Sequence, residues 1–150
     1  MLLHIPQVLT LAQVTEIRQL LDTTEHWTNG RQSAGSQAQK IKNNLQLDVH
    51  SELYQAISSA ILNTLKQQLL IQSAALPKHI LRPMLNCYQD SGNYGNHVDN
   101  AIHTCSDTGQ LIRTDVSLTL FLSNPDEYEG GELVVEDNYG MHEVKLDAGD

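Results

Sequence analysis

The sequence predicts an α+β fold in which N-terminal helices pack on a β-sandwich or barrel. Apolar residues at helical spacing occupy much of the first half of the chain, and short strand-like segments separated by turn residues follow from Ile80 onward. Helices followed by a run of short strands are typical of helices that cover a β-sheet core. The chain has 150 residues, 40% of them hydrophobic, which is enough for one domain. We expect residues 1–79 to form a helical buttress and residues 80–150 to form the β-rich part of the same domain.

Two helices are expected in the first half of the chain. Thr10 and Gln13 have the spacing of a capping box, so the first helix should begin there and run to about Thr24. Ser51 can cap a second helix that runs to about Gln72. Apolar residues recur every four positions in this second segment: Leu53, Ile57, Ile61, Leu65 and Leu69.

The expected strands are short and connected by polar loops. Residues 28–44 form a polar loop in this interpretation, and residues 45–49 form a short extended segment. Residues 101–110 are also expected to be a loop. Asp115–Ser123 alternates over its whole length and is the clearest strand. The other predicted strands are Ile80–Tyr88, Glu132–Glu136 and Met141–Leu146.

Composition excludes some classes of partner. The formal net charge of −9 disfavours nucleic acid and anionic membranes, because both bind basic surfaces. The two cysteines, Cys87 and Cys105, do not form a CxxC motif, and a disulfide framework is not expected. The N-terminus lacks the basic and apolar regions of a signal peptide, and no apolar run is long enough to span a bilayer. We therefore expect a cytoplasmic protein.

The chemistry of the chain centres on His97 and Asp99. Residues two apart on an extended strand point to the same face, so this imidazole and carboxylate can reach one metal ion. Such a pair, with a second histidine from elsewhere, makes the 2-His-1-carboxylate triad of non-haem Fe(II) enzymes. A His-x-Asp sequence alone is a weak signal, since it occurs by chance in many proteins.

Other stretches give this pair a context. They are Gly30-Arg31, Ala34-Gly35, Gln37-Ala38, Lys42-Asn43-Asn44, Gln46-Leu47, Asn86-Cys87-Tyr88, Gly95–Ala101, Arg113–Ser117 and Leu120–Leu133. In combination they resemble the bacterial PKHD-type hydroxylases, which are relatives of prolyl 4-hydroxylases among the Fe(II)/2-oxoglutarate dioxygenases. The resemblance covers nearly all of the 150 residues and is far more specific than His-x-Asp alone.

The resemblance implies a fold, cofactors and site residues. The fold would be a double-stranded β-helix, or jelly roll, with N-terminal helices packed on the sheet. The cofactors would be Fe(II), 2-oxoglutarate as cosubstrate and L-ascorbate as a supporting reductant, with succinate and CO2 released. His97 and Asp99 match the first two iron ligands, and Tyr88 matches a tyrosine near 2-oxoglutarate. No further catalytic side chain is assigned.

Two parts of the family's site have no counterpart in this sequence. The resemblance puts the second iron-binding histidine on a later strand, past the turn that Gly149 and Asp150 begin, and the arginine that binds the 5-carboxylate of 2-oxoglutarate still later. We therefore expect the chain to be the N-terminal part of a longer enzyme, with residues 80–150 forming the first part of the jelly roll.

Other candidate ligands and functional residues have simpler interpretations. His142 falls where the family has an ordinary strand residue, and His103 lies in a polar loop. Arg113 and Asp115 could orient groups around the site or form an exposed ion pair. Residues 126–129 contain an acidic cluster typical of a solvated loop.

Three functions remain open from the sequence. The first is an Fe(II)- and 2-oxoglutarate-dependent dioxygenase acting on a small-molecule or peptidyl substrate that the sequence does not identify. The second is a non-catalytic jelly-roll module that binds a metal or partner, or an inert fragment, because the third iron ligand and the arginine are absent. The third, a cupin-like binder of sugars or small acids, does not explain the family-like stretches. The oligomeric state is not predicted.

Overall fold

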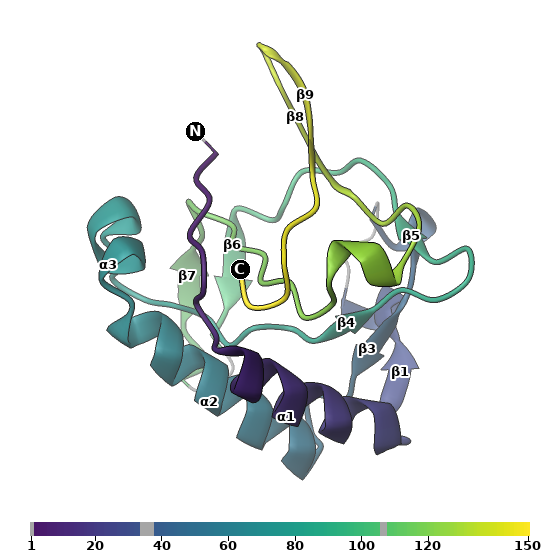
Figure 1. The fold of residues 1–150 in the computed structure, drawn as a ribbon. Coiled ribbons are helices and arrows are strands. Elements are labelled where there is room, and N and C mark those ends of the chain that lie inside the picture. Colours follow the sequence, from purple (N-terminus) through teal and green to yellow (C-terminus); the bar gives the residue numbers. More distant parts are fainter. Residues whose placement is uncertain (1, 34–37, 106–107) are drawn as a thin grey trace. The chain divides into compact units, whose positions relative to one another are not determined.

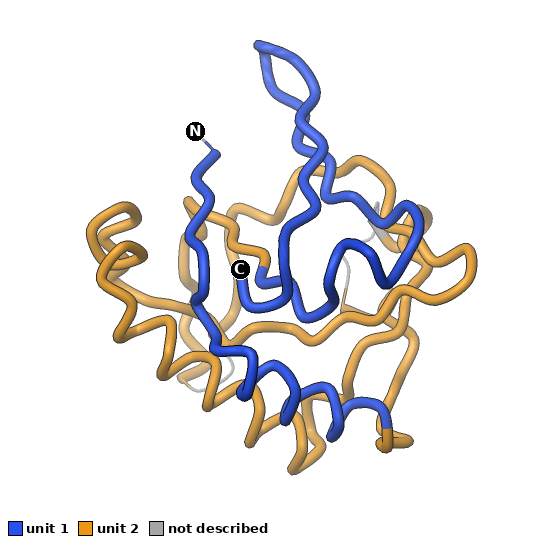
Figure 2. The backbone as a smooth tube through the Cα atoms, in the orientation of Figure 1, with its two compact units in different colours: residues 1–22, 120–150 blue, residues 23–119 orange. Residues whose placement is uncertain are grey.

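The structure, a computed structural model, describes residues 2–33, 38–105 and 108–150. The family-like residues Ala34, Gly35 and Gln37 lie outside the described residues. The chain divides into two compact units: unit 1 comprises residues 1–22 and 120–150, and unit 2 comprises residues 23–119 (Figure 2). Each unit combines residues from both sides of position 80. The expected division into a helical buttress, residues 1–79, and a β-rich part, residues 80–150, stays a prediction.

Unit 1 contains the first predicted helix. α1 spans Leu11–Thr23 and buries Val14 and Ile17. The capping box is confirmed, because the Thr10 N–H donates to Gln13 Oε1 at 2.9 Å and the Gln13 N–H donates to Thr10 Oγ1 at 3.3 Å. Two backbone donors at the start of the helix are thereby satisfied without tertiary contacts, which is why the sequence alone locates the beginning of the helix.

The rest of unit 1 is a turn of 3-10 helix and a β-hairpin. The 3-10 turn η3 spans Pro125–Glu127, and the hairpin strands are β8, Leu133–Asp137, and β9, Gly140–Val144. The strands are antiparallel and form the projecting hairpin in Figure 1. Both strands predicted in this segment are confirmed, with bounds shifted by one or two residues. In the acidic loop, Glu127 accepts hydrogen bonds from Arg18, and this pairing holds the pKa of its carboxyl below the ordinary value.

Unit 2 contains the second predicted helix, which is broken. α2 spans Glu52–Gln67 and starts as predicted, with the Tyr54 N–H donating to Ser51 Oγ at 3.1 Å. The prediction of one helix to Gln72 is wrong, because Gln68 has ψ 110, outside the helical range, and α3 then spans Leu69–Ala75. The Gln72 side chain donates to the Leu65 carbonyl, which has become one of the last carbonyls of α2.

The strands of unit 2 form three small antiparallel sheets within the described residues. The first has the order β1-β3-β4 and buries Leu47 completely. The second pairs β2 with β5, and the third pairs β6 with β7. The bounds are β1 Trp27–Asn29, β2 Lys42–Asn43, β3 Leu45–Leu47, β4 Asn86–Cys87, β5 Asn93–Tyr94, β6 Ile102–Thr104 and β7 Leu111–Arg113. The 3-10 turns η1 and η2 span Gly30–Ser33 and Ala38–Lys40.

Four segments differ from the sequence predictions. The predicted strand Ile80–Tyr88 is reduced to the two residues of β4, and the predicted loops 28–44 and 101–110 contain short strands. Asp115–Ser123 is described throughout, yet it contains no strand. Alternation favours an extended backbone, but a strand also needs a hydrogen-bonded neighbour along its length, and this segment lacks a ladder in the described structure.

The architecture is mixed α+β, as predicted, with three α-helices and separate antiparallel sheets in the residues described. The finer expectation of a jelly-roll core stays a prediction. Across the ranges that the structure describes, each helix is too short or too polar to cross a membrane.

We predict that Gly30→Ala destabilises the protein. A Cβ at position 30 would lie 2.0 Å from Asn44 Oδ1 and 3.2 Å from the Asn44 carbonyl oxygen. Forcing a methyl group into such a contact should lower the free energy of unfolding by about 2 kcal/mol, measured by urea denaturation.

A double-mutant cycle with Asn44→Ala provides the control. Removing the Asn44 amide removes the closer of the two obstacles, so the added cost of Gly30→Ala should shrink in that background. Equal costs in the two backgrounds would show that the contact with the Asn44 side chain is not the cause.

Candidate metal site

The segment that carries His97 and Asp99 begins at a short ladder in unit 2. β5 pairs with β2 so that Tyr94 lies opposite Lys42. The next residue, Gly95, continues the pairing, because its N–H donates to the Ile41 carbonyl at 3.0 Å. A Cβ on Gly95 would lie 3.2 Å from the Ile41 Cβ, which is a tight contact. The chain therefore leaves the ladder at Gly95, two residues before the histidine.

The imidazole of His97 is held by the backbone of its own segment. Its Nδ1 lies 2.8 Å from the Gly95 carbonyl oxygen. A carbonyl can only accept a hydrogen bond, so Nδ1 carries the proton in this contact. The other nitrogen, Nε2, is then the one that can bind a metal in the neutral imidazole. Metal-binding histidines usually donate their second N–H to a carbonyl or carboxylate in this way.

Asp99 lies on the metal-binding side of this imidazole. His97 Nε2 and Asp99 Oδ1 are 3.3 Å apart, with exposed side-chain fractions of 25% and 62%. Two neighbouring ligands in an octahedral shell, each ~2.1 Å from the metal, lie ~3 Å apart. The two atoms are thus close to the spacing that one shared cation requires.

The Tyr94 side chain packs on His97, and Lys42 lies beside Tyr94. The Tyr94 ring stacks on the imidazole with a centroid distance of 3.7 Å and an interplanar angle of 19°. On β2, the amine of Lys42 lies 5.0 Å from the centroid of the Tyr94 ring. Burial raises the pKa of Tyr94, and the Asp99 carboxylate raises it further. Burial also lowers the pKa of Lys42.

Tyr88, the predicted 2-oxoglutarate contact, lies in the same unit just after β4 and is 48% exposed. Partial burial raises the pKa of Tyr88, Tyr94 adds to the rise, and a hydrogen bond with the Asn44 side chain acts in the opposite direction. This interaction connects Tyr88 to Asn44, the residue between β2 and β3. The role predicted for Tyr88 is not tested by these contacts.

A third metal ligand is not found in the part of the chain that the structure describes. Among residues 2–33, 38–105 and 108–150, no group of three His, Cys, Asp or Glu side chains could hold a metal ion. His103 lies on β6 opposite Ile112, and His142 lies on β9 with its Nε2 3.8 Å from Asp137 Oδ1. Neither therefore completes a triad with His97 and Asp99 in the described structure.

Other residues that the sequence singled out have ordinary surroundings. Arg113 Nε and Asp115 Oδ1 are 2.8 Å apart with mostly exposed side chains, as one of the two interpretations predicted. Cys87 and Cys105, both described, form no disulfide.

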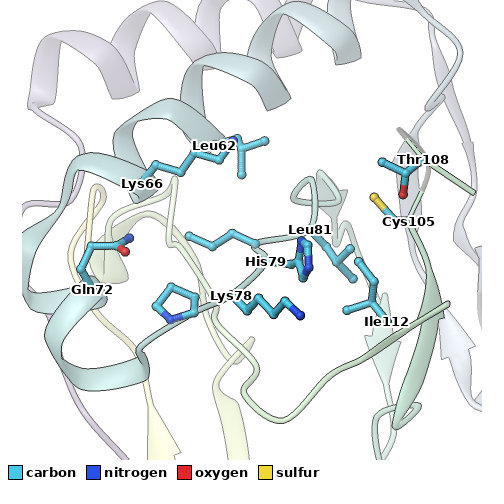
Figure 3. A pocket seen from close by; sticks show the side chains of 11 residues that line it. Leu62, Lys66, Gln72, Lys78, His79, Leu81, Cys105, Thr108 and Ile112 are labelled. Atoms are coloured by element: carbon cyan, nitrogen blue, oxygen red, sulfur yellow. The ribbon is translucent and has the colours of Figure 1, made fainter. Parts of the chain in front are cut away.

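Unit 2 also has a cavity of about 280 Å³ that the sequence did not predict (Figure 3). Lys66, Lys78, His79 and Cys105 are among its lining residues, whereas His97, Asp99 and Tyr88 are not. It is therefore separate from the predicted metal site.

Comparison with known proteins identifies the family, although no protein-family model matches the chain. A PKHD-type hydroxylase of Aliarcobacter butzleri is 49% identical over 150 residues, which are 100% of this chain and 66% of the relative. One of Saccharophagus degradans is 51% identical over 151 residues, with the same coverage. One of Paracoccus denitrificans is 48% identical over 149 residues, which are 99% of this chain and 65% of the relative.

The chain belongs to the PKHD-type hydroxylase family. The predicted resemblance is thus confirmed. The chain spans just under two thirds of the length of these curated hydroxylases, so the activity of a whole family member is a proposal here.

Sequence reasoning missed two residues of this site. Lys42 was noted only as part of a family-like stretch, and Tyr94 was given no role of its own. The feature that brings them together is the antiparallel pairing of β2 with β5. This pairing places the two residues opposite each other, although they are 52 positions apart in the sequence. Pairing at that separation is not visible in local periodicity.

We predict that Asp99→Asn lowers the pKa of Tyr94. The Asp99 carboxylate opposes ionisation of the nearby phenol, so removing its charge should move the Tyr94 titration toward that of an ordinary tyrosine. NMR of the labelled tyrosine ring as a function of pH measures the shift. Asp90→Asn is the matched control, and an equal shift in both variants would contradict the arrangement.

Proposed function

We propose that this chain provides part of an Fe(II)- and 2-oxoglutarate-dependent dioxygenase that hydroxylates a small-molecule or peptidyl substrate. One observation carries the proposal: His97 Nε2 and Asp99 Oδ1 lie 3.3 Å apart while Nδ1 is bound to the Gly95 carbonyl. This arrangement presents a nitrogen and an oxygen donor to the same point. Membership of the PKHD-type hydroxylase family supports the same chemistry.

The donor atoms suit two of the three protein positions of an Fe(II) facial triad, and His97 and Asp99 would hold the metal. Bound iron would supply activation of O2 and oxidative decarboxylation of 2-oxoglutarate to succinate and CO2, with L-ascorbate keeping the metal reduced. The chain's own contribution is geometric. The Gly95 carbonyl fixes the tautomer and plane of His97, and Tyr94 covers one face of the imidazole.

We infer that Tyr88 contacts 2-oxoglutarate. It lies in the same unit as His97 and interacts with Asn44, the residue that directly follows β2, and β2 pairs with the segment leading to the proposed metal ligands. Among the described residues no third side chain completes a metal site with His97 and Asp99, and no residue of this sequence was assigned as the family's second histidine or carboxylate-binding arginine. We infer that they belong to the third of the family members' length that this chain does not cover. The jelly-roll core and a cytoplasmic location are parts of the same proposal.

A second candidate is a non-catalytic module that binds a metal or a partner. The observation that favours it is the missing third ligand within the described part of the chain. Two protein ligands and water would hold Fe(II), Zn(II) or Mn(II) weakly and with little selectivity.

Metal titration and product detection separate these functions. We predict that His97→Ala and Asp99→Ala each weaken Co(II) binding by the 150-residue chain at least ~10-fold, measured by calorimetry. His103→Ala and His142→Ala are matched controls and should bind like the unaltered chain.

Succinate formation tests catalysis. The protein expressed from its complete reading frame, supplied with Fe(II) and 2-oxoglutarate, should release succinate, and His97→Ala should not. Metal binding without any succinate above the His97→Ala background would favour the non-catalytic module. Equal metal binding by the unaltered chain and His97→Ala would refute the metal site itself.

A further inference from the structure

Lys42 is buried in a place where lysine is unusual. It is only 4% exposed, and lysine is rarely buried without a charged partner. Its amine donates to Ser33 Oγ at 3.0 Å, and no carboxylate among the described residues lies within ion-pair distance of it. The other group beside the amine is the Tyr94 ring, 5.0 Å away at its centroid. The cation therefore faces an aromatic surface in place of an anion.

Two contacts hold the backbone of Lys42 in place. Arg31 Nε donates to the Lys42 carbonyl at 2.7 Å, and the β2–β5 ladder sets Lys42 opposite Tyr94. With this backbone held and the side chain almost completely buried, Lys42 has little room to move its amine away from the ring. The amine of Lys42 contacts the Tyr94 ring, so a displacement of Lys42 would remove a contact that holds this ring.

The Tyr94 ring in turn packs against the imidazole of His97. The ring lies nearly parallel to the imidazole at 3.7 Å, so it limits tilting of the imidazole out of its plane. The Nδ1 contact with the Gly95 carbonyl, at 2.8 Å, limits rotation within that plane. The two restraints act on different motions, and together they determine where Nε2 points.

We propose that Lys42 and Tyr94 are positioning residues for the metal-binding histidine: the buried amine of Lys42 holds the Tyr94 ring, and that ring holds the plane of His97. The proposal rests on the proposed iron site and adds two residues that would act on the metal only through His97. Neither residue needs to contact the metal or the substrate. The effect is pre-organisation of Nε2 toward Asp99 before metal binds.

The first experiment uses the metal-free chain. The aromatic ring current of Tyr94 should shift the ring-proton NMR signals of His97 upfield, and His97→Ala identifies those signals among the seven histidines. Tyr94→Phe should keep the shift, and Tyr94→Leu should abolish it. Lys42→Met, which keeps most of the length of the side chain but not the charge, should reduce it. Lys40→Met, at an exposed position two residues earlier, should leave it unchanged.

The second experiment measures Co(II) affinity by calorimetry. Lys42→Met and Tyr94→Leu should each weaken binding by about 10-fold, the usual effect of losing a group that orients a ligand. Tyr94→Phe and Lys40→Met should bind like the unaltered chain. The methyl signals of Ile57 and Ile61 in α2 report whether each variant is folded.

The outcomes distinguish this proposal from the proposed function. If His97→Ala loses Co(II) but Lys42→Met keeps both affinity and the His97 signals, the positioning role is refuted and the metal site stands. If His97→Ala binds Co(II) as well as the unaltered chain, the metal site is refuted and the positioning role falls with it. If Lys42→Met does not fold, the comparison of Tyr94→Leu with Tyr94→Phe decides, and equal affinities overturn the proposal.

Discussion

The two-residue ladder between β2 and β5 is the constraint on which the candidate site depends. It pairs Lys42 with Tyr94 and Asn43 with Asn93, and the Gly95 N–H extends it to Ile41. From there the chain turns so that the Gly95 carbonyl meets His97 Nδ1. A ladder this short is not stable alone. The packing of β2 must therefore hold the ladder in place, and the residues around Lys42 provide that packing.

Those residues bury polar side chains in an alternating pattern. Lys42, Asn44 and Gln46 are 4%, 7% and 4% exposed, and their spacing of two places them on one face of the extended chain. No donor or acceptor among the described residues reaches Asn44 Oδ1 or Gln46 Nε2, although the other end of the Asn44 amide donates to Asn86. Burying a polar group without a hydrogen-bond partner is costly, so such atoms are rare in folded proteins. Residues 42–46 therefore carry buried polar side chains next to the β2–β5 pairing on which the candidate site depends.

The sequence predicted features that local chemistry determines. The Thr10–Gln13 capping box and the Ser51 cap are complete within a few residues, so both helix starts were found. His97 and Asp99 lie close together, as expected for residues two apart on an extended chain, although neither lies on a strand, and their role as metal ligands stays a prediction. Pairing between distant segments could not be predicted in this way. Asp115–Ser123 alternates but lacks a ladder in the described structure. The contact of Lys42 with Tyr94 depends on a strand register that tertiary structure sets.

The geometry of His97 and Asp99 also bears on why a third ligand matters. The Nε2 and Oδ1 atoms already stand 3.3 Å apart, so little further movement is needed for both to reach one ion. Pre-organisation reduces the cost of ordering the ligands, but it does not distinguish one divalent metal from another. Discrimination depends on the number, type and arrangement of all the ligands. In the proposed iron site, a nitrogen and an oxygen donor from one segment would therefore provide two ligands, and selectivity for Fe(II) would depend on the ligand that completes the set.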